Sequence, residues 1–135
     1  MAYLLDTNIC IHLMQVHPPQ VVERFRQLKV GEVLMSVVTY AELRHGVERC
    51  TPGNKEAAEQ ALGRFVARVP VLPFDKRAAE SYGLIAAAVR DRRRDALDRL
   101  IAAHAVSVGA VLVTNNEADF RNYPRLVVEN WARPV

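Results

Sequence analysis

Short apolar runs alternate with segments of helical spacing along the chain, and this alternation restricts the fold more than any other feature. The runs at residues 2–6, 32–38, 69–73 and 110–114 read as short buried strands. A helix-like segment separates each run from the next, as parallel strands require. The sequence therefore predicts an α/β fold, with a short central parallel sheet flanked by helices on both faces.

Capping and helix-breaking residues set the expected helix boundaries. Thr39 is expected to cap one helix and Asp75 another, Gly109 to end a third, and residues 51–54 (TPGN) to form a turn. Helices are predicted over residues 8–16, 19–28, 40–50, 55–69, 75–91, 96–109 and from 115 onward, with a last edge strand over 126–130.

The length and composition predict one folded domain over residues 1–135. Half of the residues are hydrophobic and about a quarter are charged. No apolar run approaches the roughly 20 residues of a membrane span, so no membrane partner is expected. The first residues lack the basic region of a signal peptide, and a cytoplasmic location is the resulting expectation.

Three acids occupy positions where a parallel sheet would bring them together. Asp6 follows the first apolar run, Glu42 is expected in the first turn of the helix after the second strand, and Asp98 lies at the start of an apolar helix. Reactive groups of such folds gather at the carboxyl ends of the strands. Each acid also has an ordinary structural explanation, as a helix cap, as a partner of the helix dipole, or as a partner of Arg94 or Arg99.

The four histidines show no spacing typical of zinc ligands. A site built from carboxylates alone favours a hard cation such as Mg²⁺, which keeps several waters and binds one or two protein carboxylates. Such a metal usually serves phosphoryl transfer, because it neutralises phosphate charge and activates a bound water.

Five sequence blocks together resemble the PIN-domain ribonuclease toxins of the VapC type. They are LLDTN at 4–8, AELRHG at 41–46, DRLIAAHA at 98–105, LVTNN at 112–116 and VENW at 128–131. The resemblance covers almost the whole chain, in the order and spacing of the family. It implies a PIN-like fold and a Mg²⁺-dependent endoribonuclease, with Mn²⁺ as the expected substitute.

The same resemblance assigns roles to individual residues. Asp6 and Asp98 match the metal ligands of the family, and Glu42 would help to hold the metal or orient water. Many relatives carry another acid at the place of Asn116, and Asp119 is the natural substitute for it in the catalytic cluster. Supporting roles behind the acids are expected for Thr7, Asn8, Thr114 and Asn116.

Arginine dominates the basic residues, with 15 arginines against three lysines and a net charge of +3. Arginine suits phosphate contacts, although it also suits ordinary surface ion pairs. The loop before Asp98 is shorter than in many relatives and lacks their Gly and Pro residues. Contact with the RNA backbone is the expectation for Arg90, Arg92, Arg93 and Arg94, and the alternative is a solvated loop neutralised by Asp91 and Asp95.

The resemblance also implies partners. These are an RNA substrate, with tRNA as the leading guess, and a VapB-type antitoxin. A homodimer and a toxin–antitoxin hetero-oligomer are expected, with operator DNA contacted only through the antitoxin. One alternative is an inactive PIN module that binds RNA or protein. A receiver-type signalling domain is a poorer match, because the first strand is followed by a single acid and no lysine follows Lys76.

Overall fold

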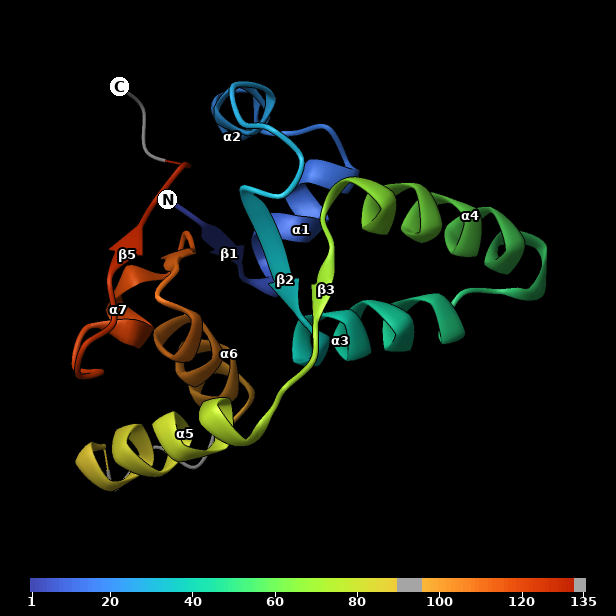
Figure 1. The fold of residues 1–135 in the computed structure, drawn as a ribbon. Helices are drawn as coiled ribbons and strands as arrows, with labels where there is room; N and C mark the ends of the chain where they lie inside the picture. The colour runs from blue at the N-terminus through green and yellow to red at the C-terminus, as the bar shows by residue number, and fades with distance from the viewer. Residues whose placement is uncertain (90–95, 133–135) are drawn as a thin grey trace.

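A five-stranded parallel sheet forms the centre of the molecule (Figure 1). The computed structural model describes residues 1–89 and 96–132. The spatial order of the strands is β3-β2-β1-β4-β5, so the chain builds outward on one side of β1 and then crosses to the other side. The strands are β1 (Tyr3–Leu5), β2 (Val33–Ser36), β3 (Val71–Leu72), β4 (Val111–Val113) and β5 (Val128–Glu129).

Helices cover both faces of this sheet, which confirms the predicted fold class. Successive strand residues point to opposite faces. Leu5 and Val113 therefore pack into one apolar cluster, whereas Leu4 and Leu112 pack into the other. The helices are α1 (Thr7–Met14), α2 (Pro19–Arg26), α3 (Val37–Glu48), α4 (Pro52–Arg68), α5 (Lys76–Ala88), α6 (Ala96–Val108) and α7 (Glu117–Phe120).

The two clusters use different helices. The first contains apolar residues of α1 to α4, and the second contains apolar residues of α5, α6 and α7. None of the described helices combines the length and the apolar character that a transmembrane segment requires.

The start of α3 differs from the prediction. Ser36 caps this helix, because its Oγ accepts a hydrogen bond of 3.1 Å from the Val38 backbone N–H. The expected cap, Thr39, is instead a buried residue inside the helix. Both residue types favour capping, and the β-branched Val37 and Val38 suit a strand as well as a helix. As a result Glu42 lies in the second turn of α3 rather than in the first.

Other boundaries follow local chemistry more closely. The predicted turn at 51–54 is wrong, because Pro52 occupies the first position of α4, where a missing N–H costs nothing. Asp75 does cap α5, since its Oδ1 accepts from the Ala78 N–H at 2.9 Å. Gly109 adopts φ of 67° directly after α6, which ends that helix as predicted.

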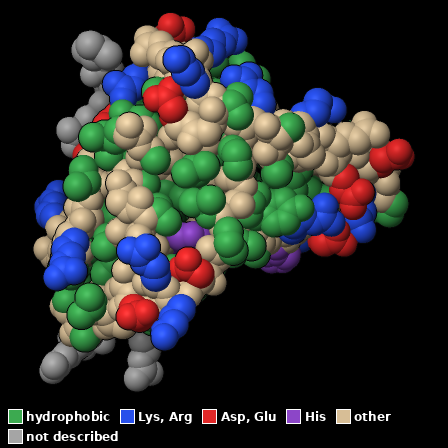
Figure 2. All heavy atoms as spheres, viewed as in Figure 1, with side chains coloured by type: hydrophobic (Ala, Val, Ile, Leu, Met, Phe, Trp, Pro, Cys, Tyr) green, Lys and Arg blue, Asp and Glu red, His purple; other side chains and the backbone are tan. Residues whose placement is uncertain are grey.

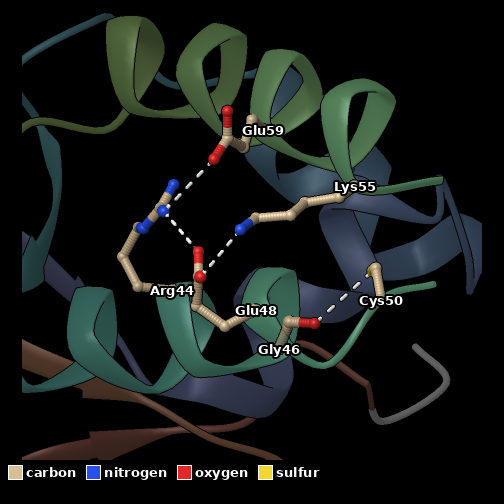
Figure 3. A network of polar contacts seen from close by, with 6 residues as sticks. All are labelled: Arg44, Gly46, Glu48, Cys50, Lys55 and Glu59. Carbon is tan, nitrogen blue, oxygen red and sulfur yellow. Dashed lines mark hydrogen bonds and ion pairs between the residues drawn. The ribbon is translucent and has the colours of Figure 1, made fainter. Parts of the chain in front are cut away.

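A polar network on the surface joins α3 to α4 (Figure 3). Arg44 contacts Glu48 at 2.8 Å and Glu59 at 3.4 Å, and Lys55 contacts Glu48 at 2.9 Å. These side chains are exposed, so each pair adds little stability. Arg44 lies in the same helix as Glu42, and through this network it has two carboxylate partners on the surface.

Candidate active site

Asp6 lies where β1 ends and α1 begins, and it is only 6% exposed. Its Oδ1 accepts a hydrogen bond of 2.9 Å from the Ile9 N–H, so Asp6 is the helix cap that the sequence allowed. The Thr114 hydroxyl, from the residue after β4, also hydrogen-bonds the Asp6 carboxylate. Capping fixes the position of the carboxylate and leaves the group available for a ligand, so the two roles considered for Asp6 are compatible.

Burial raises the pKa of Asp6 above its ordinary value of 3.8. Hydrogen bonds from Thr114 and Ile9 and the nearby His12 imidazole lower the pKa and offset part of this effect, whereas the negative charge of Glu42 raises it further. The fold therefore holds a desolvated carboxylate near a second acid, an arrangement that a bound cation would relieve.

Glu42 is held close to Asp6 by hydroxyl groups. The Thr7 hydroxyl, in the first turn of α1, donates a hydrogen bond of 2.5 Å to Glu42 Oε1. Thr39 Oγ1 lies 3.5 Å from Thr7 Oγ1. Residues 39 and 42 are one helical turn apart and therefore face α1 together. Asp6 and Glu42 thus meet at the carboxyl edge of the sheet, although 36 positions separate them in the sequence.

Asp98 lies in the first turn of α6 and is partly buried. Because α6 leads directly into β4, and β4 runs parallel to β1, this helix ends at the amino edge of the sheet and begins at the carboxyl edge. The topology therefore places Asp98 at the same edge as Asp6 and Glu42. The negative charge also suits the helix N-terminus.

His104 ties α6 to the start of α3. Its side chain is 1% exposed, and its Nδ1 lies 2.7 Å from Ser36 Oγ. Ser36 Oγ already accepts the Val38 N–H, so its own proton is free to be donated to Nδ1. The imidazole also has a hydrogen-bonding partner in the Pro73 backbone. Burial lowers the pKa of His104, which favours this neutral form, and the imidazole is a satisfied core residue rather than a metal ligand.

The segment after β4 contacts Asp6 through the side chain of Thr114. Thr114 is fully buried, and its Oγ1 accepts the Asn116 N–H at 3.0 Å. Asn116 stands at the predicted cap position of α7, but its side chain makes no capping hydrogen bond. Thr114 has taken the role of anchoring this turn. Asp119 lies in the single turn of α7 and is partly buried.

One predicted residue, Asn8, lies apart from this core of contacts. Asn8 is exposed on α1, and it has no side-chain hydrogen bond to the residues that the structure describes. The proposed RNA-contacting residues Arg90, Arg92, Arg93 and Arg94 lie outside the described residues.

His12 and Asn115 are the site residues that sequence reasoning did not find. Asn115 Nδ2 lies 3.1 Å from His12 Nε2, which joins α1 to the segment after β4. A search for metal-ligand spacing could not detect His12, because its partner is an amide 103 residues away. The sequence feature that could have indicated His12 is its position one helical turn after Asn8, on the side of α1 that carries polar residues.

The donors at this edge fit a hard divalent cation. They are carboxylate and hydroxyl oxygens from Asp6, Glu42 and Thr114. Within residues 1–89 and 96–132, no three His, Cys, Asp or Glu side chains are grouped closely enough to hold a metal ion between them. Magnesium usually takes one or two protein carboxylates and keeps several waters, so a site with fewer direct ligands suits it.

An apolar pocket of about 360 Å³ opens next to Glu42, between α1, α3 and α4. Hydrophobic side chains occupy the middle of the face in Figure 2, and most Lys and Arg side chains lie toward its margins. The pocket is lined by Ile11, Met14, Gln15, Glu42, Leu43, Gly46, Val47, Arg49, Cys50, Ala58 and Ala61.

Known proteins resemble this chain over almost its full length. The sequence matches the PIN domain over residues 3–126. It is 37% identical over 132 residues to the tRNA(fMet)-specific endonuclease VapC of Shigella flexneri, covering 96% of this chain and 98% of that protein. It is 33% identical over 134 residues to Ribonuclease VapC2 of Rickettsia felis, covering 97% and 98%.

Solved structures show the same relationship. The DNA-bound VapBC complex of Salmonella typhimurium contains a chain with a TM-score of 0.85 and 32% identity, covering 98% of this chain and 99% of that one. The predicted family and fold class are both confirmed. The chain belongs to the PIN-domain family, in its VapC-type branch.

Proposed function

We propose that this protein is a divalent-metal-dependent endoribonuclease that acts as the toxin of a type II toxin–antitoxin pair. The observation that carries this proposal is the buried Asp6 held beside Glu42 at the carboxyl edge of the sheet. The two similar proteins named above, a tRNA(fMet)-specific endonuclease and a ribonuclease, support an RNA substrate.

Mg²⁺ is the proposed cofactor, with Mn²⁺ as its substitute, because the donors are hard oxygens. Asp6 and Asp98 would hold the ion. When bound, the metal would neutralise phosphate charge and lower the pKa of a coordinated water.

The chain's own residues prepare this edge for hydrolysis of a phosphodiester. Thr114 and the Ile9 N–H keep the Asp6 carboxylate fixed and favour its ionised form. Thr7 orients Glu42, whose second carboxylate oxygen can accept a hydrogen bond from the attacking water. Supporting roles behind these acids are proposed for Asn8, Asn116 and Asp119.

The proposed substrate contacts and partners extend beyond this edge. Arg90, Arg92, Arg93 and Arg94 would contact the RNA backbone, and a tRNA is the proposed substrate because the Shigella relative is named for one. A VapB-type antitoxin is the proposed partner, since similar chains occur in VapBC complexes, some of them bound to DNA. The antitoxin would cover the apolar pocket beside Glu42 and carry the DNA contacts, and the toxin would dimerise in the complex.

The test separates an active enzyme from an inactive PIN module that only binds RNA or protein. Purified protein should cleave RNA with Mg²⁺ or Mn²⁺ and should stop when EDTA is added. Asp98→Asn should abolish cleavage and leave the thermal unfolding of the metal-free protein intact, because asparagine keeps the size of the side chain and removes only the charge that would hold the metal. Equal cleavage by the variant and the parent would overturn the assignment of Asp98.

A further inference from the structure

His12 and Asn115 form a polar pair beside the acidic edge. The proposed hydrolysis gives this pair no role. His12 comes from α1, and Asn115 comes from the segment after β4, so the 3.1 Å contact bridges the two elements on either side of Asp6. Asn115 is exposed and His12 is partly buried. The pair is therefore open to a ligand that approaches the acids.

The pair lies close to Asp6. The His12 imidazole is near enough to influence the pKa of the Asp6 carboxylate. Asn8 precedes His12 by one helical turn on the same side of α1 and is exposed. Polar side chains thus continue outward from the buried acid along α1, in a direction that a chain of nucleotides crossing the acidic edge could follow.

The chemistry of the pair suits a nucleobase better than a phosphate. Hydrogen bonds to a ring nitrogen lie near the plane of the imidazole, so the 3.1 Å contact with Asn115 does not occupy the faces of the ring. An imidazole ring can stack on an unpaired base, and an amide can hydrogen-bond the edge of a base. Asn115 is uncharged and therefore lacks the positive charge that a phosphate contact would favour.

We propose that His12 and Asn115 form a subsite for one unpaired RNA base next to the scissile phosphodiester. His12 supplies the stacking surface, and Asn115 fixes the ring orientation and contacts the base edge. The subsite deepens the proposed function, because it rests on a single-stranded segment of RNA passing over Asp6 and Glu42.

Binding of short single-stranded oligoadenylate and oligouridylate tests the subsite. All variants are made in the Asp98→Asn background, so that cleavage does not interfere, and their folding is checked by thermal melts. His12→Ala should weaken binding about tenfold, within the range of base–aromatic stacking. His12→Phe should retain most of the affinity, because phenylalanine keeps the stacking surface. Asn115→Ala should have a smaller effect, and this effect should shrink when His12 is already alanine, because only the contact with the base edge is then left to lose.

The salt dependence separates a base contact from a phosphate contact. A stacking contact releases no counterion, so His12→Ala should leave the slope of log affinity against log salt unchanged. Gln27→Ala, at an exposed residue that ends α2, serves as the matched control and should bind like the background protein. The subsite is overturned by unchanged affinity in His12→Ala, by a reduced salt slope, or by His12→Phe binding as weakly as His12→Ala.

Cleavage assays without the Asp98→Asn substitution separate the proposed base subsite from the proposed nuclease activity. His12→Ala in that chain should lower kcat/KM by about the same tenfold factor. If the parent fails to cleave RNA but the binding differences above appear, the proposed hydrolysis fails and the base subsite stands. If the parent cleaves and His12→Ala cleaves equally well, the subsite fails and the nuclease stands.

Discussion

Two glutamates on the same helix, Glu42 and Glu48 of α3, have opposite surroundings. Glu48 contacts Lys55 and Arg44, and these partners lower its pKa. Glu42 accepts a hydrogen bond from the Thr7 hydroxyl and lies near the buried Asp6. In the part of the chain that the structure describes, neither Glu42 nor Asp6 forms an ion pair with a lysine or arginine.

The different surroundings of these acids show which of them needs a cation from solution. On the surface between α3 and α4 the chain supplies its own positive charges, so the acids there are already neutralised. At the carboxyl edge the chain supplies hydroxyls and backbone N–H groups, which orient carboxylates without neutralising them. Burial raises the pKa of Asp6, whereas ion pairing lowers that of Glu48. Ionisation of Asp6 therefore lowers the free energy of unfolding, and ionisation of Glu48 raises it.

The largest expected effect is the loss of cleavage on Asp6→Asn. Asn keeps the capping hydrogen bond to Ile9 but removes the charge that would hold the metal. RNA cleavage should fall by more than the roughly 10–100-fold that is typical for groups behind a metal ligand. A rate assay under equal Mg²⁺ checks this, and near-parental cleavage would show that Asp6 is only a cap.

The same variant should make the metal-free protein more stable at neutral pH. An acid with a raised folded pKa destabilises the fold once it ionises, so stability of the parent falls as pH rises from 3.8 through the raised pKa of Asp6. Melting temperatures in EDTA should therefore be higher for Asp6→Asn at neutral pH. The gap should close as pH falls through that raised pKa, where the parent is protonated as well. A lower melting temperature for the variant at neutral pH would contradict this account.

Metal ions should stabilise the parent and not Asp6→Asn. Only the folded chain assembles the carboxyl edge, so binding adds to stability by mass action. At about 100 times the dissociation constant, the gain is roughly 2.7 kcal/mol. Thermal melts with increasing Mg²⁺ and Mn²⁺ measure this gain, and an equal response of both proteins would place the metal elsewhere.

Thr7→Val tests whether orientation of Glu42 matters. Valine has a similar shape but no hydroxyl, so Glu42 loses its 2.5 Å hydrogen bond. Cleavage should fall about tenfold, within the range seen for groups that orient a metal site. Thr7→Ser keeps the hydroxyl and should restore most of the rate. If serine and valine behave alike, the hydroxyl has no part in the reaction.

The sequence predicted the parts of this site that depend on local patterns. Asp6 could be placed because it ends an apolar run, and the helix of Asp98 could be placed because Gly109 ends it. The turn of Glu42 was misjudged because Ser36 and Thr39 both favour capping, and only the packing of Thr39 into the core decides between them.

Long-range pairings could not be predicted in the same way. The contacts between Thr7 and Glu42 and between His12 and Asn115 join segments far apart in the chain. They depend on the strand order, which places β1 between β2 and β4. Glu42 and Glu48 also look alike in sequence, and only the packing of α4 against α3 gives Glu48 its lysine.

A smaller effect is expected for Asp119 in α7. Asp119→Asn should reduce cleavage a few-fold, with little change in melting temperature, if Asp119 serves the reaction from behind the metal ligands. Asn116→Ala is the matched comparison. The Asn116 side chain makes no capping hydrogen bond, so its removal should also leave the melting temperature unchanged, without the roughly 1 kcal/mol cost of a lost cap. Parental cleavage by Asp119→Asn would remove this acid from the site.

The smallest effect is expected for Glu48→Gln, which completes the comparison within α3. Glutamine keeps the size of the side chain but loses the charge that contacts Lys55 and Arg44. These pairs are exposed, so the melting temperature should fall only slightly, and the difference should shrink in high salt. Cleavage and the response to Mg²⁺ should stay parental, because this acid already has its cations within the chain. A clear loss of activity would mean that the α3–α4 network positions the acidic edge, and Glu42 and Glu48 would then have to be treated as one functional unit.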